Sequence, residues 1–151
     1  MTFDELQELA DKDLKLNDTE LDIESLKTPA LHNKYCKFHN QYVNLLKKAE
    51  QDRDIMIRDK WEYYTGKADP QVYRENPFNL KILKPDVDKY LKSDKDLIKL
   101  EQKVTYIEST VNYLDKTIRL IANRSFQIKN AIECRKSSTN ITNAISSKEH
   151  I

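Results

Sequence analysis

The chain has 151 residues, of which 38% are apolar and 34% charged, and its formal net charge is +1. It contains one glycine, Gly66, and four prolines. Sheet turns, barrels and phosphate-cradling loops depend on glycine, so the composition argues against all three and predicts an all-α protein of long helices with few joints. No stretch approaches the length of a membrane span, which predicts a soluble intracellular protein.

The charge is balanced overall but not along the chain. Residues 1–28 are strongly acidic, whereas residues 116–136 carry six basic residues and a single acidic one. The net charge of the whole chain therefore conceals an acidic N-terminal segment, which we call the acidic head, and a basic segment expected to be helical, which we call the basic helix. Two interpretations stay open: these are ordinary solvated helix faces, or the basic helix binds an anionic partner.

Short helices are expected before the first long one. Thr2 and Glu5 form a capping-box pattern that predicts a helix over residues 2–14. Thr19 can cap a second short helix that runs to about residue 26.

The first long helix is expected over residues 29–65. Thr28 and Pro29 fit the N-cap and first helical position, and Gly66 fits the residue that ends the helix. Three of the four prolines follow within residues 66–92, which we interpret as a connector.

The second long helix is expected over residues 93–136. Ser93 is its predicted N-cap, with acidic residues in the first turn. The tail, residues 137–151, loses the apolar pattern and is predicted to be disordered. Residues 1–136 are therefore interpreted as one helical domain.

An apolar ridge runs along the second long helix in steps of three and four residues, and Ser125 is its only polar position. Its members are Leu97, Leu100, Val104, Ile107, Val111, Leu114, Ile118, Ile121, Ile128 and Ile132. Steps of three and four over five heptads are typical of a coiled-coil or helix-bundle seam. The ridge can be covered within the chain by the first long helix, or between copies. We expect self-association of more than two copies through these ten residues, and both arrangements can hold together.

The sequence contains no constellation typical of an enzyme. The three histidines have no metal-pair spacing, and the two cysteines, expected as free thiols, lie far apart. Walker, zinc-protease, EF-hand and nucleophile-elbow motifs are missing from it. We therefore expect a protein that is not an enzyme and that uses no cofactor or metal.

One segment, residues 57–67, combines cations with aromatic rings. It holds the only tryptophan and the only glycine of the chain, two adjacent tyrosines and three basic residues. Single-stranded nucleic acid requires cations for phosphates and flat rings for bases. The alternative is a helix end whose aromatic residues anchor the connector by packing. Spacing alone leaves both open.

Four segments together resemble the UvsY family, recombination mediators of T4-type bacteriophages. In residues 57–67 (IRDKWEYYTGK), a basic–x–basic pair precedes an acidic residue, Tyr-Tyr, a hydroxyl residue, Gly and a basic residue. Ser93–Asp96, Ser125–Lys129 and the acidic start Phe3–Gln7 also match, in the family's order. The order of Arg and Lys in the basic pair is exchanged, and the residue between them is acidic.

The resemblance implies a protein without enzymatic activity that forms a ring-like homo-oligomer and binds single-stranded DNA without sequence preference. It would displace the phage single-strand-binding protein and load a RecA-like recombinase, in the cytoplasm of the infected bacterial host. Each subunit of such an assembly would bind DNA weakly, but the repeated binding surfaces would together bind one strand tightly, because the first contact raises the effective concentration for the next. The expected DNA contacts are Arg58 and Lys60, then Lys67, Tyr63, Tyr64 and Trp61, and, from the basic helix, Arg124 and Lys129. The competing interpretation is a structural coiled-coil adaptor that binds no nucleic acid.

Overall fold

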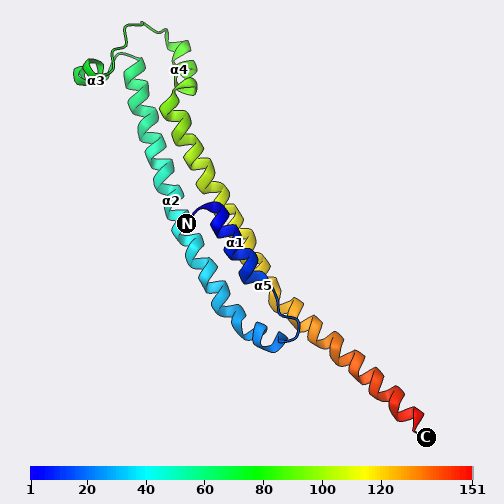
Figure 1. Cartoon of the computed structure of the whole chain (residues 1–151). Helices are drawn as coiled ribbons and strands as arrows, with labels where there is room; N and C mark the ends of the chain where they lie inside the picture. The colour runs from blue at the N-terminus through cyan, green and yellow to red at the C-terminus, as the bar shows by residue number, and fades with distance from the viewer. Residues whose placement is uncertain (151) are drawn as a thin grey trace. The chain divides into compact units, whose positions relative to one another are not determined.

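The computed structural model describes residues 1–150, which contain helices and no strand (Figure 1). The elements are α1 (Phe3–Leu14), α2 (Leu21–Tyr64), α3 (Pro70–Glu75), the 3-10 turn η1 (Lys84–Asp86), α4 (Val87–Ser93) and α5 (Lys95–Glu149). The predicted all-α class, with two long helices and a proline-containing connector, is confirmed. No helix among these residues is both long and apolar enough to cross a membrane.

Backbone proximity groups the chain into two compact units. The terminal unit combines Met1–His39 with the chain from Asn112 onward, and the central unit is Asn40–Val111. Each of the helices α2 and α5 is divided between the units, with one part in the terminal unit and the other part in the central unit. The sequence predicted one domain, because the helical periodicity continues without a break through both boundaries.

In the terminal unit, α1 packs on α2 and α5. The predicted capping box is present, since Thr2 and Glu5 each accept a hydrogen bond from the other's backbone N–H. Leu6 and Ala10 have no exposed surface. The ring of Phe3 meets that of Tyr113 edge-on, with centroids 5.4 Å apart. Burial of this apolar face holds a 12-residue helix that would be marginal alone.

In the central unit, the last part of α2 and the first part of α5 form an antiparallel hairpin (Figure 1). Ala49, Val104 and Ile107 form its buried cluster, with Tyr42 and Leu46 packed against it. The small Ala49 side chain allows the two helices to approach closely.

α2 ends as the sequence predicted. Gly66 adopts φ +76°, a left-handed conformation that side chains disfavour. The N–H of Lys67 donates to the carbonyl of Glu62 at 2.8 Å, and the N–H of Gly66 to that of Tyr63 at 3.4 Å. This pair of bonds is a Schellman motif, which satisfies carbonyls left over at the helix end.

The predicted start of the first long helix is wrong. α2 begins at Leu21 rather than Pro29, so the expected short helix from Thr19 is its first turns and Pro29 lies inside it. Proline inside a helix removes one backbone hydrogen bond. Glu24 and Thr28 are nevertheless buried in the terminal unit, and this tertiary packing keeps the segment helical.

The predicted cap of the second long helix is displaced by one residue. Ser93 is the last residue of α4, and its hydroxyl donates to the carbonyl of Lys89. Asp94 caps α5 instead, because its carboxylate accepts the N–H groups of Asp96 and Leu97, each at 3.0 Å. The connector also contains the short elements α3, η1 and α4. The sequence did not predict them, because three prolines in this segment argued against regular structure.

The chain's own helices cover much of the apolar ridge. Six of its ten members are buried: Leu97, Val104, Ile107, Leu114, Ile121 and Ile128. The other four, Leu100, Val111, Ile118 and Ile132, are only half-buried, and Ser125 is exposed. In the terminal unit the buried stripe instead passes through Thr117 and Arg124. Intramolecular packing therefore accounts for one side of the ridge and leaves the other partly open.

The segment 137–149 continues α5, whereas the sequence predicted a disordered tail. Its side chains are exposed, so tertiary packing does not hold it. The segment contains neither glycine nor proline, so no strong helix breaker stops α5 before it. Thr139 and Thr142 donate to carbonyls four residues earlier.

Candidate nucleic-acid interface

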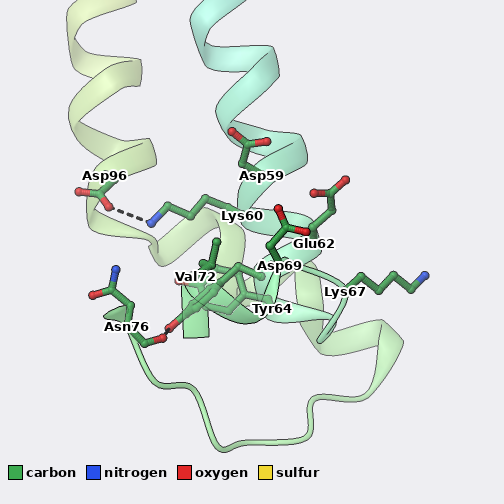
Figure 2. A pocket seen from close by; sticks show the side chains of 11 residues that line it. Asp59, Lys60, Glu62, Tyr64, Lys67, Asp69, Val72, Asn76 and Asp96 are labelled. Atoms are coloured by element: carbon green, nitrogen blue, oxygen red, sulfur yellow. Dashed lines mark hydrogen bonds and ion pairs between the residues drawn. The ribbon is translucent and has the colours of Figure 1, made fainter. Parts of the chain in front are cut away.

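The segment 57–67 forms the end of α2 in the central unit and borders an open cavity of about 610 Å³ (Figure 2). Four carboxylates line this cavity beside two lysines, and its remaining lining is aromatic, apolar or amide. The carboxylates are those of Asp59, Glu62, Asp69 and Asp96. Because acidic groups outnumber basic ones, the cavity is not a ready anion site as it stands.

Lys60 points across the cavity to the start of α5 (Figure 2). Its ammonium lies 2.8 Å from the carboxylate of Asp96 and 3.2 Å from that of Asp94. The hydroxyl of Tyr64 donates to the same Asp94 oxygen at 2.6 Å. These contacts tie the end of α2 to the beginning of α5, so Lys60 has a structural role that the sequence did not reveal.

The ionisation of these groups follows from their contacts. Burial alone would lower the pKa of Lys60, but hydrogen bonds to Asp96 and Asp94 outweigh it and raise the pKa above its ordinary value. Burial would raise the pKa of Asp94, yet hydrogen bonds from Tyr64, the Leu97 N–H and Lys60 lower it. Burial, and then the bond to Asp94, raise the pKa of Tyr64. These shifts favour the ammonium form of Lys60, the carboxylate form of Asp94 and the neutral phenol form of Tyr64.

The two adjacent tyrosines pack against the connector. Tyr63 stacks on Tyr73, with ring centroids 5.5 Å apart and planes 16° from parallel. Both Tyr63 and Tyr64 contact the ring of Phe78, and Tyr64 contacts Tyr90. For these two residues the structure matches the packing alternative, since their rings hold the connector on the helix end.

Arg58, Trp61 and Lys67 form an exposed surface, which we call the Trp61 face, and of these three residues only Lys67 also lines the cavity. The side chain of Arg58 is 67% exposed and has one weak contact, at 3.4 Å, to its neighbour Asp59. Trp61 lies one turn later and is 40% exposed, an unusual position for so large a ring. The ammonium of Lys67 lies 4.5 Å from the Trp61 ring centroid. Two cations thus flank one accessible aromatic face.

The two candidates from the basic helix lie in the terminal unit and differ sharply. Lys129 is exposed. Arg124 is only 4% exposed: its guanidinium forms an ion pair with Glu24 and donates to the carbonyl of Asp13 at 3.2 Å. Burial and pairing leave Arg124 no access to a DNA phosphate, so we exclude it from the candidate interface.

The acidic head neutralises part of the basic helix within the terminal unit. Besides the pair of Arg124, Arg135 lies 3.8 Å from the Asp18 carboxylate. Asp13 accepts from the Lys34 ammonium at 2.7 Å. Through the pairs of Arg124 and Arg135, the charge asymmetry of the sequence therefore serves partly to join segments that lie 100 or more residues apart.

Potential metal ligands do not gather in the part of the chain that the structure describes: no three His, Cys, Asp or Glu side chains are placed to hold an ion. Cys36 and Cys134 are both free thiols.

A comparison with family models decides the family. The model described as "Recombination, repair and ssDNA binding protein UvsY" matches residues 9–140, most of the chain. The chain belongs to the UvsY family. The recombination protein uvsY of Enterobacteria phage T4 is 22% identical to this UvsY-family member over 135 residues, which cover 89% of this chain and 96% of the phage protein.

Two crystal structures of the bacteriophage T4 recombination mediator UvsY share the fold. One has a TM-score of 0.81 at 22% identity and covers 92% of this chain and 98% of its own. The other has a TM-score of 0.78 at 20% identity and covers 91% and 99%. The helical arrangement of this UvsY-family chain is therefore shared with T4 UvsY, despite the low identity.

Sequence reasoning missed two residues at the candidate interface. Asp94 and Asp96 were expected only as helix-start residues, but they also hold Lys60. Their position after a proline-rich connector gave no sign of which cation they would meet. In a UvsY-family chain, the matched motifs at residues 57–67 and 93–96 are thus spatial neighbours.

Proposed function

We propose that this chain is a phage recombination mediator that binds single-stranded DNA without sequence preference. On this proposal it weakens the hold of the phage single-strand-binding protein and helps to load a RecA-like recombinase, in the cytoplasm of the infected bacterial host. Family membership supports this assignment, and the Trp61 face is the structural observation that carries it.

The Trp61 face has the two elements that such binding requires. Arg58 and Lys67 supply charges for successive phosphates, and Trp61 supplies a surface on which a base of any identity can stack. Neither element reads base edges, so the binding is independent of sequence. Lys129 is a second phosphate contact on this proposal. Tyr63 and Tyr64 support the site by holding the helix end, and Lys60 binds phosphate once one of its carboxylate partners has been displaced.

A salt titration with single-stranded oligonucleotide tests the site. We expect Arg58→Gln to weaken binding about tenfold at low salt, because one charge-assisted contact is lost from each subunit. The slope of log K against log salt should decrease by about 0.7 for each subunit that contacts the strand. Trp61→Ala should weaken binding without changing this slope, because stacking releases no counterion.

Lys92→Gln is the matched control. The Lys92 side chain is 79% exposed and pairs with Asp88, so it resembles Arg58 in exposure and charge but belongs to α4 and is not one of the three residues of the Trp61 face. We expect its affinity to stay close to that of the wild-type chain. Equal losses in R58Q and K92Q would show that general charge, rather than this face, binds the strand.

Assembly through the half-buried side of the ridge completes the proposal. Val111, Ile118 and Ile132 recur at seven-residue intervals or multiples of seven, and the chain's own helices leave all three partly open. Copies that bury them would form the predicted ring and repeat the Trp61 face around it, so that weak patches act together.

Light scattering tests the assembly. Ile118→Asp should reduce the mass towards that of one chain, because a carboxylate would be buried in the contact. Ile141→Asp, at a position that is 61% exposed and off the ridge, should leave the mass unchanged. Circular dichroism separates lost assembly from lost folding. A wild-type chain that is monomeric at micromolar concentration would refute this part of the proposal.

The mediator step has its own test. Single-stranded DNA coated with the phage single-strand-binding protein should accept the recombinase faster when the wild-type chain is added, and less so with R58Q. An equal acceleration by both chains would contradict the role of the Trp61 face in that step.

A structural adaptor without DNA binding is the second candidate. The observation that favours it is the pairing of the acidic head with the basic helix, through Arg124–Glu24 and Arg135–Asp18, which uses these charges for packing. Under that function, oligonucleotide would show no salt-dependent binding to the wild-type chain.

A further inference from the structure

Lys60 is already occupied by anions of the chain itself. An ammonium has three N–H donors, and the carboxylates of Asp94 and Asp96 take two of them, at 3.2 and 2.8 Å. The Lys60 side chain is only 24% exposed. A phosphate that approaches Lys60 from the cavity therefore meets one remaining donor and two negative charges.

The two carboxylates are not equivalent. The Asp94 side chain is 5% exposed and also accepts hydrogen bonds from Tyr64 and from two backbone N–H groups at the start of α5. It is part of the fold. The Asp96 side chain is 69% exposed, and its contact with Lys60 is the one drawn in Figure 2. Asp96 is therefore the partner that an external anion can displace.

We propose that Asp96 is an internal competitor for DNA phosphate at Lys60 and so sets the strength with which each subunit holds single-stranded DNA. This inference rests on the proposed function. A carboxylate and a phosphate diester present the same kind of anionic oxygen to an ammonium, and the exchange leaves the Asp94 contact in place. Lys60 contributes to binding only after Asp96 moves away, so each subunit binds more weakly than its number of cations implies.

The competition can be measured by removing the charge of Asp96 alone. Asp96→Asn keeps the size of the side chain, and Asp94 still caps α5. At low salt we expect D96N to bind an oligothymidine strand about fivefold more tightly, because Asp96 is mostly exposed and the repulsion between two water-screened anions a few ångströms apart is of that order. The salt dependence should steepen, by about 0.7 for each subunit engaged, as Lys60 gains a phosphate.

Asp69→Asn is the matched control, since Asp69 is exposed and lines the same cavity but has no contact with Lys60. It removes the same charge, so its affinity gain measures the general electrostatic effect, which we expect to stay within about twofold. The double variant K60Q/D96N supplies the second control. Its gain over K60Q should be no larger than the general effect measured with D69N, because the additional gain requires the ammonium.

NMR of the Lys60 ammonium provides a readout that stability does not affect. Its signal should shift on addition of oligothymidine in D96N, and much less in the wild-type chain. Equal affinities of D96N and D69N would overturn the inference, and so would a gain of K60Q/D96N over K60Q as large as the gain of D96N over the wild-type chain. If the wild-type chain binds the strand and D96N binds it equally well, only this inference is overturned. If the wild-type chain does not bind the strand at all, both the inference and the proposed function are refuted.

Discussion

The ion pair between Arg124 and Glu24 offers a sharp test of what holds the terminal unit together. The two side chains are 4% and 9% exposed, and they join α5 to the first turns of α2. Arg124 also donates to the backbone carbonyl of Asp13, at the end of α1. Its Nε atom is buried without a hydrogen-bond partner. Glu24→Gln keeps the shape of the side chain but leaves the guanidinium charge buried without a counter-charge.

The size of the effect follows from burial. Breaking a buried pair by removing one charge costs about 3–5 kcal/mol, because the remaining ion is desolvated and uncompensated. The amide introduced by E24Q could still accept one hydrogen bond, and Arg124 keeps its bond to Asp13, so we expect about 3 kcal/mol. For a chain of this size that corresponds to a decrease of about 6–12 °C in Tm. Replacing both partners, as in E24L/R124L, should cost less than E24Q, since neither charge is then buried.

Urea unfolding at one fixed protein concentration measures these differences. Glu20→Gln is the control: Glu20 lies one turn before Glu24 and is exposed, so its loss should cost less than about 0.5 kcal/mol. A cost below about 1 kcal/mol for E24Q, or a double variant less stable than E24Q, would refute the reasoning that the buried charge dominates.

Two further predictions concern the end of α2 and the start of α5. Gly66→Ala should destabilise the chain by about 1 kcal/mol in urea unfolding, and Gly66→Asn by less. The cost comes from the positive φ of residue 66, since no atom lies within 4 Å of an added Cβ. Equal stability of G66A and the wild-type chain would contradict this explanation. Burial opposes the ionisation of Asp94, but its hydrogen bonds lower its pKa below the ordinary 3.8, so its contribution to stability is complete above that pH and is lost as the pH falls through the lower folded-state pKa. Asp94→Asn should therefore be less stable than wild type near neutral pH, and this difference should disappear as the pH falls through the lowered folded-state pKa of Asp94; a difference that stays constant with pH would contradict the assignment.

Local signals in the sequence predicted the helix ends well where the chemistry was local. The Thr2–Glu5 capping box and the stop at Gly66 depend on groups within a few residues of each other, and both were found as expected. The prediction that the first long helix starts at Pro29 was wrong, because the preference of proline for the first helical position was outweighed by burial of the turns that precede it. Ser93 misled because two adjacent residues could both cap, and the closer packing of Asp94 decided between them.

The candidate site was predicted as a segment but not as a surface. Residues 57–67 stand out in the sequence by composition, yet composition cannot say which cation is exposed. Arg58 and Lys60 are alternate positions on one helix, and they face opposite surroundings: one faces solvent and the other two carboxylates from α5. The tyrosines were ambiguous for the same reason, since the rings that cover them come from the connector.

The amino-acid sequence by itself determined that this chain is helical, that it has two long helices joined by a connector and which segments resemble the UvsY family, because periodicity, caps and short motifs are properties of neighbouring residues. Only the tertiary structure decided that Arg124 is buried, that Lys60 is paired and that Arg58, Trp61 and Lys67 share an open face. Exposure and pairing depend on which distant segment a side chain meets, and helical spacing contains no information about that partner.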